Sequence, residues 1–208
     1  MAYDAERVRF HRLLRHEKRL QAAGYLRIAG IDEVGRGPLA GPVVACACIL
    51  PKKVLFRGLN DSKQVAPEER ERLFGELTSH PEVKYGIGIS DVATINQINI
   101  FQASLAAMRQ AISLLPEQPD YILVDGKHLP LNSIPGEAIV EGDAKSASIA
   151  AASILAKVTR DRMMVEYNEQ WPQYGFAKHK GYGTEQHQEA LRQWGPCVLH
   201  RTAFLGAR

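Results

Sequence analysis

The stretch L-R-I-A-G-I-D-E-V-G-R-G-P-L-A-G-P-V-V-A-C-A-C-I-L, residues 26–50, contains two apolar segments joined by a segment rich in glycine and proline. Residues 26–34 and 42–50 are rich in Val, Ile, Ala and Cys, which predicts two β-strands with a loop between them. The same reasoning predicts further strands at 83–90, 121–124 and 137–141, helices at 4–21, 67–79, 95–115, 144–168 and 184–194, and a loop at 126–136. This order of elements indicates an α/β fold with a mixed sheet and helices on its faces.

The composition is ordinary for a globular protein. The 208 residues are 45% apolar and 24% charged, and 26 basic against 23 acidic residues leave a net charge of +3. That sum is too small to indicate a nucleic-acid partner. The length fits one domain with a small appendage, so we divide the chain into a basic N-terminal helical segment, 1–25, and a main domain, 26–208.

The cysteines and the hydropathy pattern suggest a cytoplasmic protein. Three scattered cysteines make a disulfide framework improbable, and Cys46 and Cys48 would share one face of a strand as small hydrophobic side chains. Apolar runs fall short of the ~18 residues of a membrane span, and no signal-peptide pattern opens the chain. We therefore expect a cytoplasmic location and no membrane contact.

The charges are distributed unevenly. Residues 1–27 hold seven basic and three acidic groups, residues 28–156 hold eleven and fifteen, and residues 157–208 hold eight and five, which gives +4, −4 and +3. One interpretation is a cluster of carboxylates flanked by groups that hold a polyanion. The alternative is a set of solvated helix surfaces with a chance imbalance.

Carboxylates occur in apolar surroundings on three separate elements. Asp32 and Glu33 lie late in the first strand, Asp125 ends another in L-V-D-G, and Asp143 precedes the long helix in E-G-D-A-K. Such acids are costly to bury unless they are paired or bind a metal, and strand ends in α/β sheets are where sites form. Four carboxylates could hold two Mg²⁺-like ions, the arrangement that suits phosphodiester cleavage.

Each carboxylate also has a purely structural interpretation. Asp143 could be the N-cap of its helix, and Asp125 could be a turn residue before glycine. Glu33 could face solvent, because adjacent side chains on a strand point to opposite faces. Both members of the pair reach one site only if the strand ends or distorts there, which Gly35 and Gly37 would permit.

At this point the sequence resembles a family. The motifs are G-I-D-E-V-G-R-G-P-L-A-G-P-V-V (30–44), L-N-D-S-K (59–63), L-V-D-G (123–126), E-G-D-A-K-S-A-S-I-A-A-A-S-I-L-A-K-V-T-R-D-R (141–162), H-K-G-Y-G-T (179–184) and H-R-T-A-F (200–204). In this order they resemble bacterial ribonuclease HII over about residues 26–204. The resemblance implies a ribonuclease H-like fold with a five-stranded mixed sheet and a C-terminal helical region.

The resemblance also implies an activity. Asp32, Glu33, Asp125 and Asp143 would be the acidic tetrad that binds two Mg²⁺ or Mn²⁺ ions. The substrate would be an RNA–DNA hybrid or a DNA duplex with an embedded ribonucleotide, cut on the 5′ side of the ribonucleotide to leave a 3′-hydroxyl and a 5′-phosphate. The family removes ribonucleotides from DNA. The competing classes are a nucleic-acid-binding module that has lost catalysis and a phosphatase that acts on small molecules.

Substrate contacts follow by the same resemblance. Gly35, Arg36 and Gly37 would read the ribose 2′-hydroxyl, and Tyr182 would pack against the next deoxyribose. Their structural alternatives are an ordinary turn with an exposed arginine and a half-buried loop tyrosine.

Other candidates would contact phosphates. They are Lys63, Lys180 and the helical stripe Ser146, Ser153, Lys157 and Arg160, whose alternative is a solvent-facing stripe.

Partner expectations complete the sequence-based account. The short tail after Phe204 contains no evident sliding-clamp-binding motif, and we expect a monomer. The basic segment 1–25 lies outside the matched part and is expected to add non-specific affinity for the nucleic-acid backbone.

Overall fold

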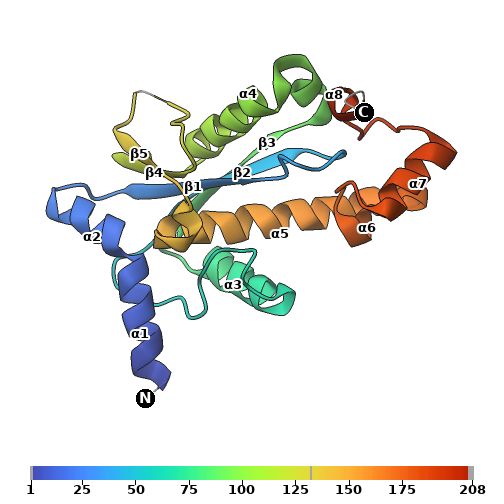
Figure 1. Ribbon diagram of the computed structural model, residues 1–208. Helices are drawn as coiled ribbons and strands as arrows, with labels where there is room; N and C mark the ends of the chain where they lie inside the picture. Colours follow the sequence, from blue (N-terminus) through green and yellow to red (C-terminus); the bar gives the residue numbers. More distant parts are fainter. Residues whose placement is uncertain (1, 132, 206–208) are drawn as a thin grey trace.

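A computed structural model describes residues 2–131 and 133–205, with a five-stranded sheet at its centre (Figure 1). The strand order is β3-β2-β1-β4-β5. The bounds are β1 Ile28–Val34, β2 Val43–Ile49, β3 Lys84–Ser90, β4 Tyr121–Asp125 and β5 Gly136–Ile139. The β1–β2 and β2–β3 pairs are antiparallel, whereas β1–β4 and β4–β5 are parallel. The predicted mixed α/β sheet is therefore confirmed.

Two long helices cover the two faces of the sheet (Figure 1). Helix α5, Ala147–Gln170, packs on β1 and β2, and α4, Val92–Ser113, packs on β3 and β2 from the other side. Gly30 lets α5 lie directly on β1, because a Cβ at this position would overlap the backbone of Ser148. Helix α3, Pro67–Ser79, has the predicted bounds and packs on α5.

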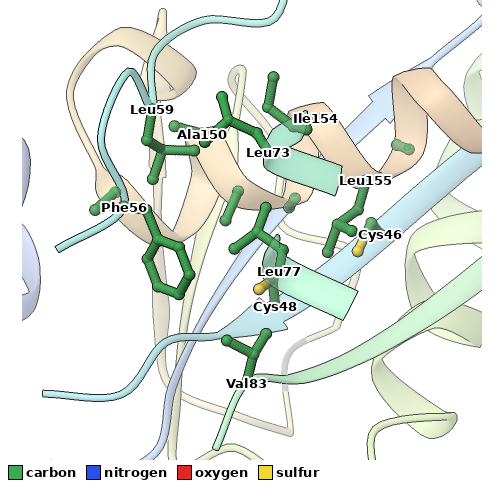
Figure 2. Packing of buried hydrophobic residues seen from close by; sticks show 14 of the residues in the cluster. Cys46, Cys48, Phe56, Leu59, Leu73, Leu77, Val83, Ala150, Ile154 and Leu155 are labelled. Carbon is green, nitrogen blue, oxygen red and sulfur yellow. The ribbon is translucent and has the colours of Figure 1, made fainter. Parts of the chain in front are cut away.

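The largest apolar core lies between α3, α5 and the sheet, as Figure 2 shows. Cys46 and Cys48 point into it from one face of β2 and are fully buried as free thiols. Burial raises the pKa of both thiols, so they stay protonated. The expected role as small hydrophobic side chains is confirmed.

The N-terminal residues form two helices instead of the single predicted one. Helix α1, Ala2–Leu13, and α2, Arg15–Ala22, are separated at Leu14. The change of direction lets Phe10 and Leu13 bury in the core of α3 and α5, while Leu20 buries beside β4 and β5. The basic segment thus contributes to the interior of the protein.

The helical bounds differ from the predictions where the backbone turns. Helix α4 starts three residues early because Asp91 caps it by accepting from the Thr94 amide at 2.8 Å, and Asn99 interrupts it with φ 67°. Helix α5 starts late because a 3₁₀ turn, η1 Gly142–Ala144, precedes it.

The C-terminal region is helical, as expected. It consists of η2 Pro172–Tyr174, α6 Phe176–His179, α7 Glu185–Trp194 and α8 Thr202–Leu205. Across the described residues, no helix is long and apolar enough to cross a membrane. Residue 132 of the predicted loop and residues 206–208 of the tail, where no clamp-binding motif is expected, lie outside the described residues.

Candidate active site

The register of the two central strands brings two of the predicted acids together. Parallel pairing of β1 with β4 runs to Ile31 and Val124. The next residue on each strand is acidic, so Asp32 follows beside Asp125 at the carboxyl ends of the two strands. Since β4 ends there while β1 continues to Val34 against β2, this edge of β1 is left open beside the acids.

Asp125 connects this strand end to the segment that carries Asp143. Its Oδ1 accepts a hydrogen bond of 2.7 Å from the Gly142 amide, the first residue of η1. Asp143 lies within this 3₁₀ turn and is buried. The N-cap of α5 is Ser146, which accepts from the Ile149 amide, so the interpretation of Asp143 as the helix cap is wrong.

Burial and repulsion by neighbouring carboxylates raise the pKa values of Asp32 and Asp143. The pKa of Asp32 lies well above its usual range because of burial and the charges of Glu33 and Asp125. Burial, together with the charges of Asp61 and Asp125, raises the pKa of Asp143 to about 6. The shifts show that Asp32, Glu33, Asp125 and Asp143 share one electrostatic environment.

Glu33 belongs to the cluster although it remains in regular strand pairing. Its partner across the sheet is Ala45, and β1 ends one residue later, before Gly35 with φ +92°. Burial raises the pKa of Glu33, the nearby Arg36 lowers it, and the charge of Asp125 raises it further. One carboxylate oxygen lies 3.1 Å from the Arg36 guanidinium, and the other is buried without a hydrogen-bond partner.

These observations test whether the residues suit divalent cations. Within the described part of the chain, no three His, Cys, Asp or Glu side chains lie in a geometry that would coordinate a metal ion as they stand. The acids instead repel one another, and the second oxygen of Glu33 has no partner. Carboxylate oxygens are the donors that Mg²⁺ and Mn²⁺ prefer, and a cation would remove both the repulsion and the orphaned acceptor. The donor set fits such ions.

Sequence reasoning missed a fifth acid, Asp61. Its charge and its hydrogen bond contribute to the raised pKa of Asp143, and its Oδ1 accepts from the Lys63 amide at 2.9 Å. Burial lowers the pKa of Lys63, but the charges of Asp143 and Asp61 outweigh it and raise the pKa overall. Lys63 therefore faces the cluster. The signal was available in L-N-D-S-K, where only the lysine was assigned a role.

Two buried arginines hold the loop of residues 35–42. Arg201 is fully buried and donates to the carbonyl oxygens of Gly35 at 2.6 Å and Arg36 at 2.9 Å, and also to those of Pro38, Gly41 and Pro42. Arg160 donates to the carbonyl oxygens of Ala40, Pro42 and Lys180. Arg201 stands in the quoted motif H-R-T-A-F, but its position at the end of the chain gave no indication of this partner.

Tyr182 lies against this loop. A Cβ placed on Gly37 would lie 3.7 Å from Cε1 of Tyr182, and 44% of the tyrosine surface is exposed. The Leu39 amide donates to the Gly181 carbonyl at 2.9 Å, which ties the two loops together. Gly37 and Tyr182 thus form one exposed surface, joined to the carboxylates through the Arg36–Glu33 ion pair.

The prediction of a polar surface stripe along α5 is wrong, because most of its residues are buried. Ser146 is fully buried and donates to Glu17 at 2.6 Å, so it is not available to a phosphate. Arg160 is also buried and neither contacts solvent nor belongs to a surface stripe. Ser153 is buried beside Asp32, and its hydroxyl donates to Ser62 at 2.9 Å.

The lysines of the predicted phosphate contacts are more accessible. Lys157 forms an ion pair of 2.7 Å with Asp161, one turn further along α5. Lys180 is half-buried, adopts a left-handed backbone conformation with φ 52°, and its ammonium contacts the Ala177 carbonyl. The Lys180 carbonyl accepts from Arg160, so the backbone two residues before Tyr182 lies against α5.

Comparison with known proteins gives consistent matches. The family model of ribonuclease HII matches residues 29–206. The ribonuclease HII of Chlamydia pneumoniae is 54% identical over 196 residues, 94% of this chain and 91% of that protein, and that of Chlamydia abortus is 52% identical over 208 residues, 100% and 97%.

Solved structures show the same fold. Ribonuclease H2 from Pyrococcus horikoshii superposes with a TM-score of 0.70 at 27% identity and covers 86% of this chain and 93% of its own. Bst-RNase HIII in complex with Mn²⁺ has a TM-score of 0.67 at 21% identity, covering 82% and 63%. Because the family model spans most of its length, this chain belongs to the ribonuclease HII family and is a metal-dependent ribonuclease.

Proposed function

We propose that the enzyme hydrolyses the phosphodiester on the 5′ side of a ribonucleotide, in RNA–DNA hybrids and in DNA duplexes with an embedded ribonucleotide. The products are a 3′-hydroxyl and a 5′-phosphate, and the role is removal of ribonucleotides from DNA. The observation that carries this proposal is the continuity of the Gly37–Tyr182 surface with the carboxylates through Arg36 and Glu33. A sugar and its neighbouring phosphate can then occupy the two parts together.

In this proposal Asp32, Glu33, Asp125 and Asp143 are the catalytic ligands of two Mg²⁺ or Mn²⁺ ions. Bound there, the ions would activate the attacking water and stabilise the leaving oxygen. The strand register holds Asp32 and Asp125 side by side, and the Gly142 amide orients the carboxylate of Asp125.

The remaining residues bind and orient the nucleic acid. Gly35 and Gly37, with Arg36 between them, let backbone groups approach the 2′-hydroxyl closely, and the two buried arginines keep that loop rigid. The Tyr182 ring packs on the following sugar.

Phosphate contacts complete the proposed interface. In this proposal Lys63, Lys157 and Lys180 contact phosphates. Ser153 lies beside Asp32 and is held there by its hydrogen bond to Ser62.

The experiment compares two duplexes of the same sequence, one all-DNA and one with a single ribonucleotide, each incubated with Mg²⁺ or Mn²⁺. We expect incision of the second duplex alone, and none with EDTA. Incision of both duplexes would indicate a nuclease without sugar discrimination, and incision of neither would overturn the proposal. A third substrate, a long RNA–DNA hybrid, measures the breadth of the activity.

We further propose that 26–208 is the catalytic domain and 1–25 its basic helical addition, since the family match begins at residue 29. We propose a monomer that works in the cytoplasm, where its three free thiols stay reduced. Sedimentation equilibrium tests the monomer, and a mass of twice the chain would contradict it.

A further inference from the structure

A basic groove adjoins the carboxylate cluster on the N-terminal side. Its volume is about 440 Å³, and it lies between helices α1 and α2, the loop before Asp61 and the turn η1. The lining residues are Arg9, Arg12, Leu13, Arg15, His16, Asn60, Ala144 and Lys145. Asn60 directly precedes Asp61 and Ala144 directly follows Asp143, so the groove begins one residue from the acids.

Most of the polar groups in this groove already have partners. Arg9 is bound by Glu6 at 2.7 Å and by the Leu59 carbonyl, and His16 hydrogen-bonds Glu137 at 3.1 Å. Lys145 lies 3.4 Å from Glu141, and its amino group donates to the carbonyl of Val140. The charges of Arg9 and Lys145 are therefore partly neutralised.

Arg12 and Arg15 are different. Both are exposed, and in the described ranges 2–131 and 133–205 neither forms an ion pair or a side-chain hydrogen bond. They are three positions apart across the break at Leu14 and line the same groove. Two guanidinium groups without an acidic partner can bind one phosphate between them or two successive phosphates of a strand. Their planar geometry matches that of a phosphate group.

The two arginines stand on a rigid support. Two residues after Arg15 in α2, Glu17 is buried and its Oε1 accepts from the Ser146 hydroxyl at 2.6 Å, the Ser148 hydroxyl at 2.7 Å and the Ser148 amide at 2.9 Å. This carboxylate fixes α2 to the N-terminus of α5, where a negative charge is favoured. Leu13, between the arginines and the core, is also buried. A flexible basic tail would show none of these contacts.

We infer that Arg12 and Arg15 bind the backbone phosphates of the nucleic-acid strand that continues past the scissile phosphate into the groove. The inference rests on the proposed function, because it takes the carboxylate cluster as the place where that strand is cut. The groove holds sugar-phosphate without reading bases, so its contribution is to affinity and not to the chemical step.

The test uses the variant Arg12→Gln/Arg15→Gln. A matched control, Lys52→Gln/Lys53→Gln, removes the same charge from two exposed lysines after β2, at the end of the sheet opposite Asp32 and Glu33. Kd for the duplex with one ribonucleotide is measured in EDTA over a range of salt concentrations, and kcat and KM are measured with Mg²⁺. Circular dichroism verifies that both variants are folded.

We expect the groove variant to lower the slope of log Kd against log salt by about 2 and to raise KM about tenfold, with kcat unchanged. The control should leave the slope and KM at the wild-type values. An unchanged slope in the groove variant, or an equal effect of the control, would overturn the inference. If the wild type fails to incise, the proposed function fails, while the Kd series still reports on the groove.

Discussion

The guanidinium of Arg201 donates a hydrogen bond of 2.6 Å to the carbonyl oxygen of Gly35, 166 positions earlier in the chain. Burial and the charge of the neighbouring Arg160 lower the pKa of Arg201 to about 9. Within residues 2–131 and 133–205, the hydrogen bonds of the Arg201 side chain go to backbone carbonyls, and they hold the loop that leads from the carboxylates of β1 to Tyr182. The end of the chain thus sets the shape of a loop near its beginning.

Arg201→Lys should therefore damage both stability and substrate discrimination. A lysine has one ammonium group and cannot bond to carbonyls spread over residues 35–42 as a planar guanidinium does. Several buried carbonyls would lose their donor, at a cost on the order of 3 kcal/mol in the free energy of unfolding. Urea unfolding measures the cost, and incision rates of the ribonucleotide and all-DNA duplexes measure discrimination.

The control for this change is Arg192→Lys on α7, an exposed arginine paired with Glu189. It should leave both quantities unchanged, because exposed ion pairs contribute little. Wild-type stability and discrimination in Arg201→Lys would show that the loop keeps its shape without the guanidinium.

Gly30→Ala should destabilise the protein strongly. The added Cβ would overlap the backbone of Ser148, so α5 would have to move away from β1, and Ser153 would move away from Asp32 with it. We expect a loss of 3 kcal/mol or more, about the upper range of overpacking effects. The matched control is Gly75→Ala on α3, where nothing lies within 4 Å.

In that control alanine should stabilise the helix by about 0.5–1 kcal/mol. Thermal unfolding of the two variants side by side measures both effects. A neutral Gly30→Ala would contradict the close approach of α5 to β1.

The stabilisation that the buried histidines contribute should be lost as the pH is lowered from about 6.5 to about 4. Burial, together with the neighbouring His187, lowers the pKa of His200 to about 4, although its hydrogen bond to Cys197 raises it. Burial also lowers the pKa values of His187 and His179, which stack on each other. At these histidines the unfolded chain binds more protons than the folded one in this window, so their contribution to stability, present above pH 6.5, is lost on acidification. The raised pKa values of Asp32, Glu33 and Asp143 act in the opposite direction.

The measurement is the free energy of unfolding in urea between pH 4 and pH 7.5. His200→Gln should lower the slope of the free energy of unfolding against pH, because one residue that takes up a proton on unfolding is gone. The exposed His128→Gln is the control and should keep the wild-type slope. A wild-type slope in His200→Gln would contradict the neutral, buried state of this side chain.

The strands and the acids were predictable because they follow local rules. Asp32 lies late in one apolar strand and Asp125 ends another, which showed in the sequence where two carboxylates could meet, and the parallel pairing places them together. The position of Asp143 was not predictable from spacing, because it lies in a 3₁₀ turn that precedes the helix capped by Ser146. Short turns of this kind depend on tertiary contacts such as the Gly142–Asp125 hydrogen bond.

The buried polar groups could not be read from the sequence. Ser146 and Arg160 lie on a helix whose polar spacing suggested a surface stripe, yet both are buried because their partners come from elsewhere in the chain. Ser146 donates to the buried Glu17, and Arg160 donates to the backbone carbonyls of Ala40 and Pro42. Periodicity reports which residues share a face, but not which distant segment will cover it.

The most direct test of the central claim compares the wild type with Asp125→Asn on a duplex with one ribonucleotide in Mg²⁺, with products mapped to single-nucleotide resolution and Kd measured in parallel. Asparagine retains an oxygen that can accept from the Gly142 amide but removes the charge that a cation requires. We expect the wild type to cut on the 5′ side of the ribonucleotide, and the variant to bind with a Kd within about threefold of the wild type while cutting at least about a thousandfold more slowly. Incision at the wild-type rate by Asp125→Asn would contradict the account.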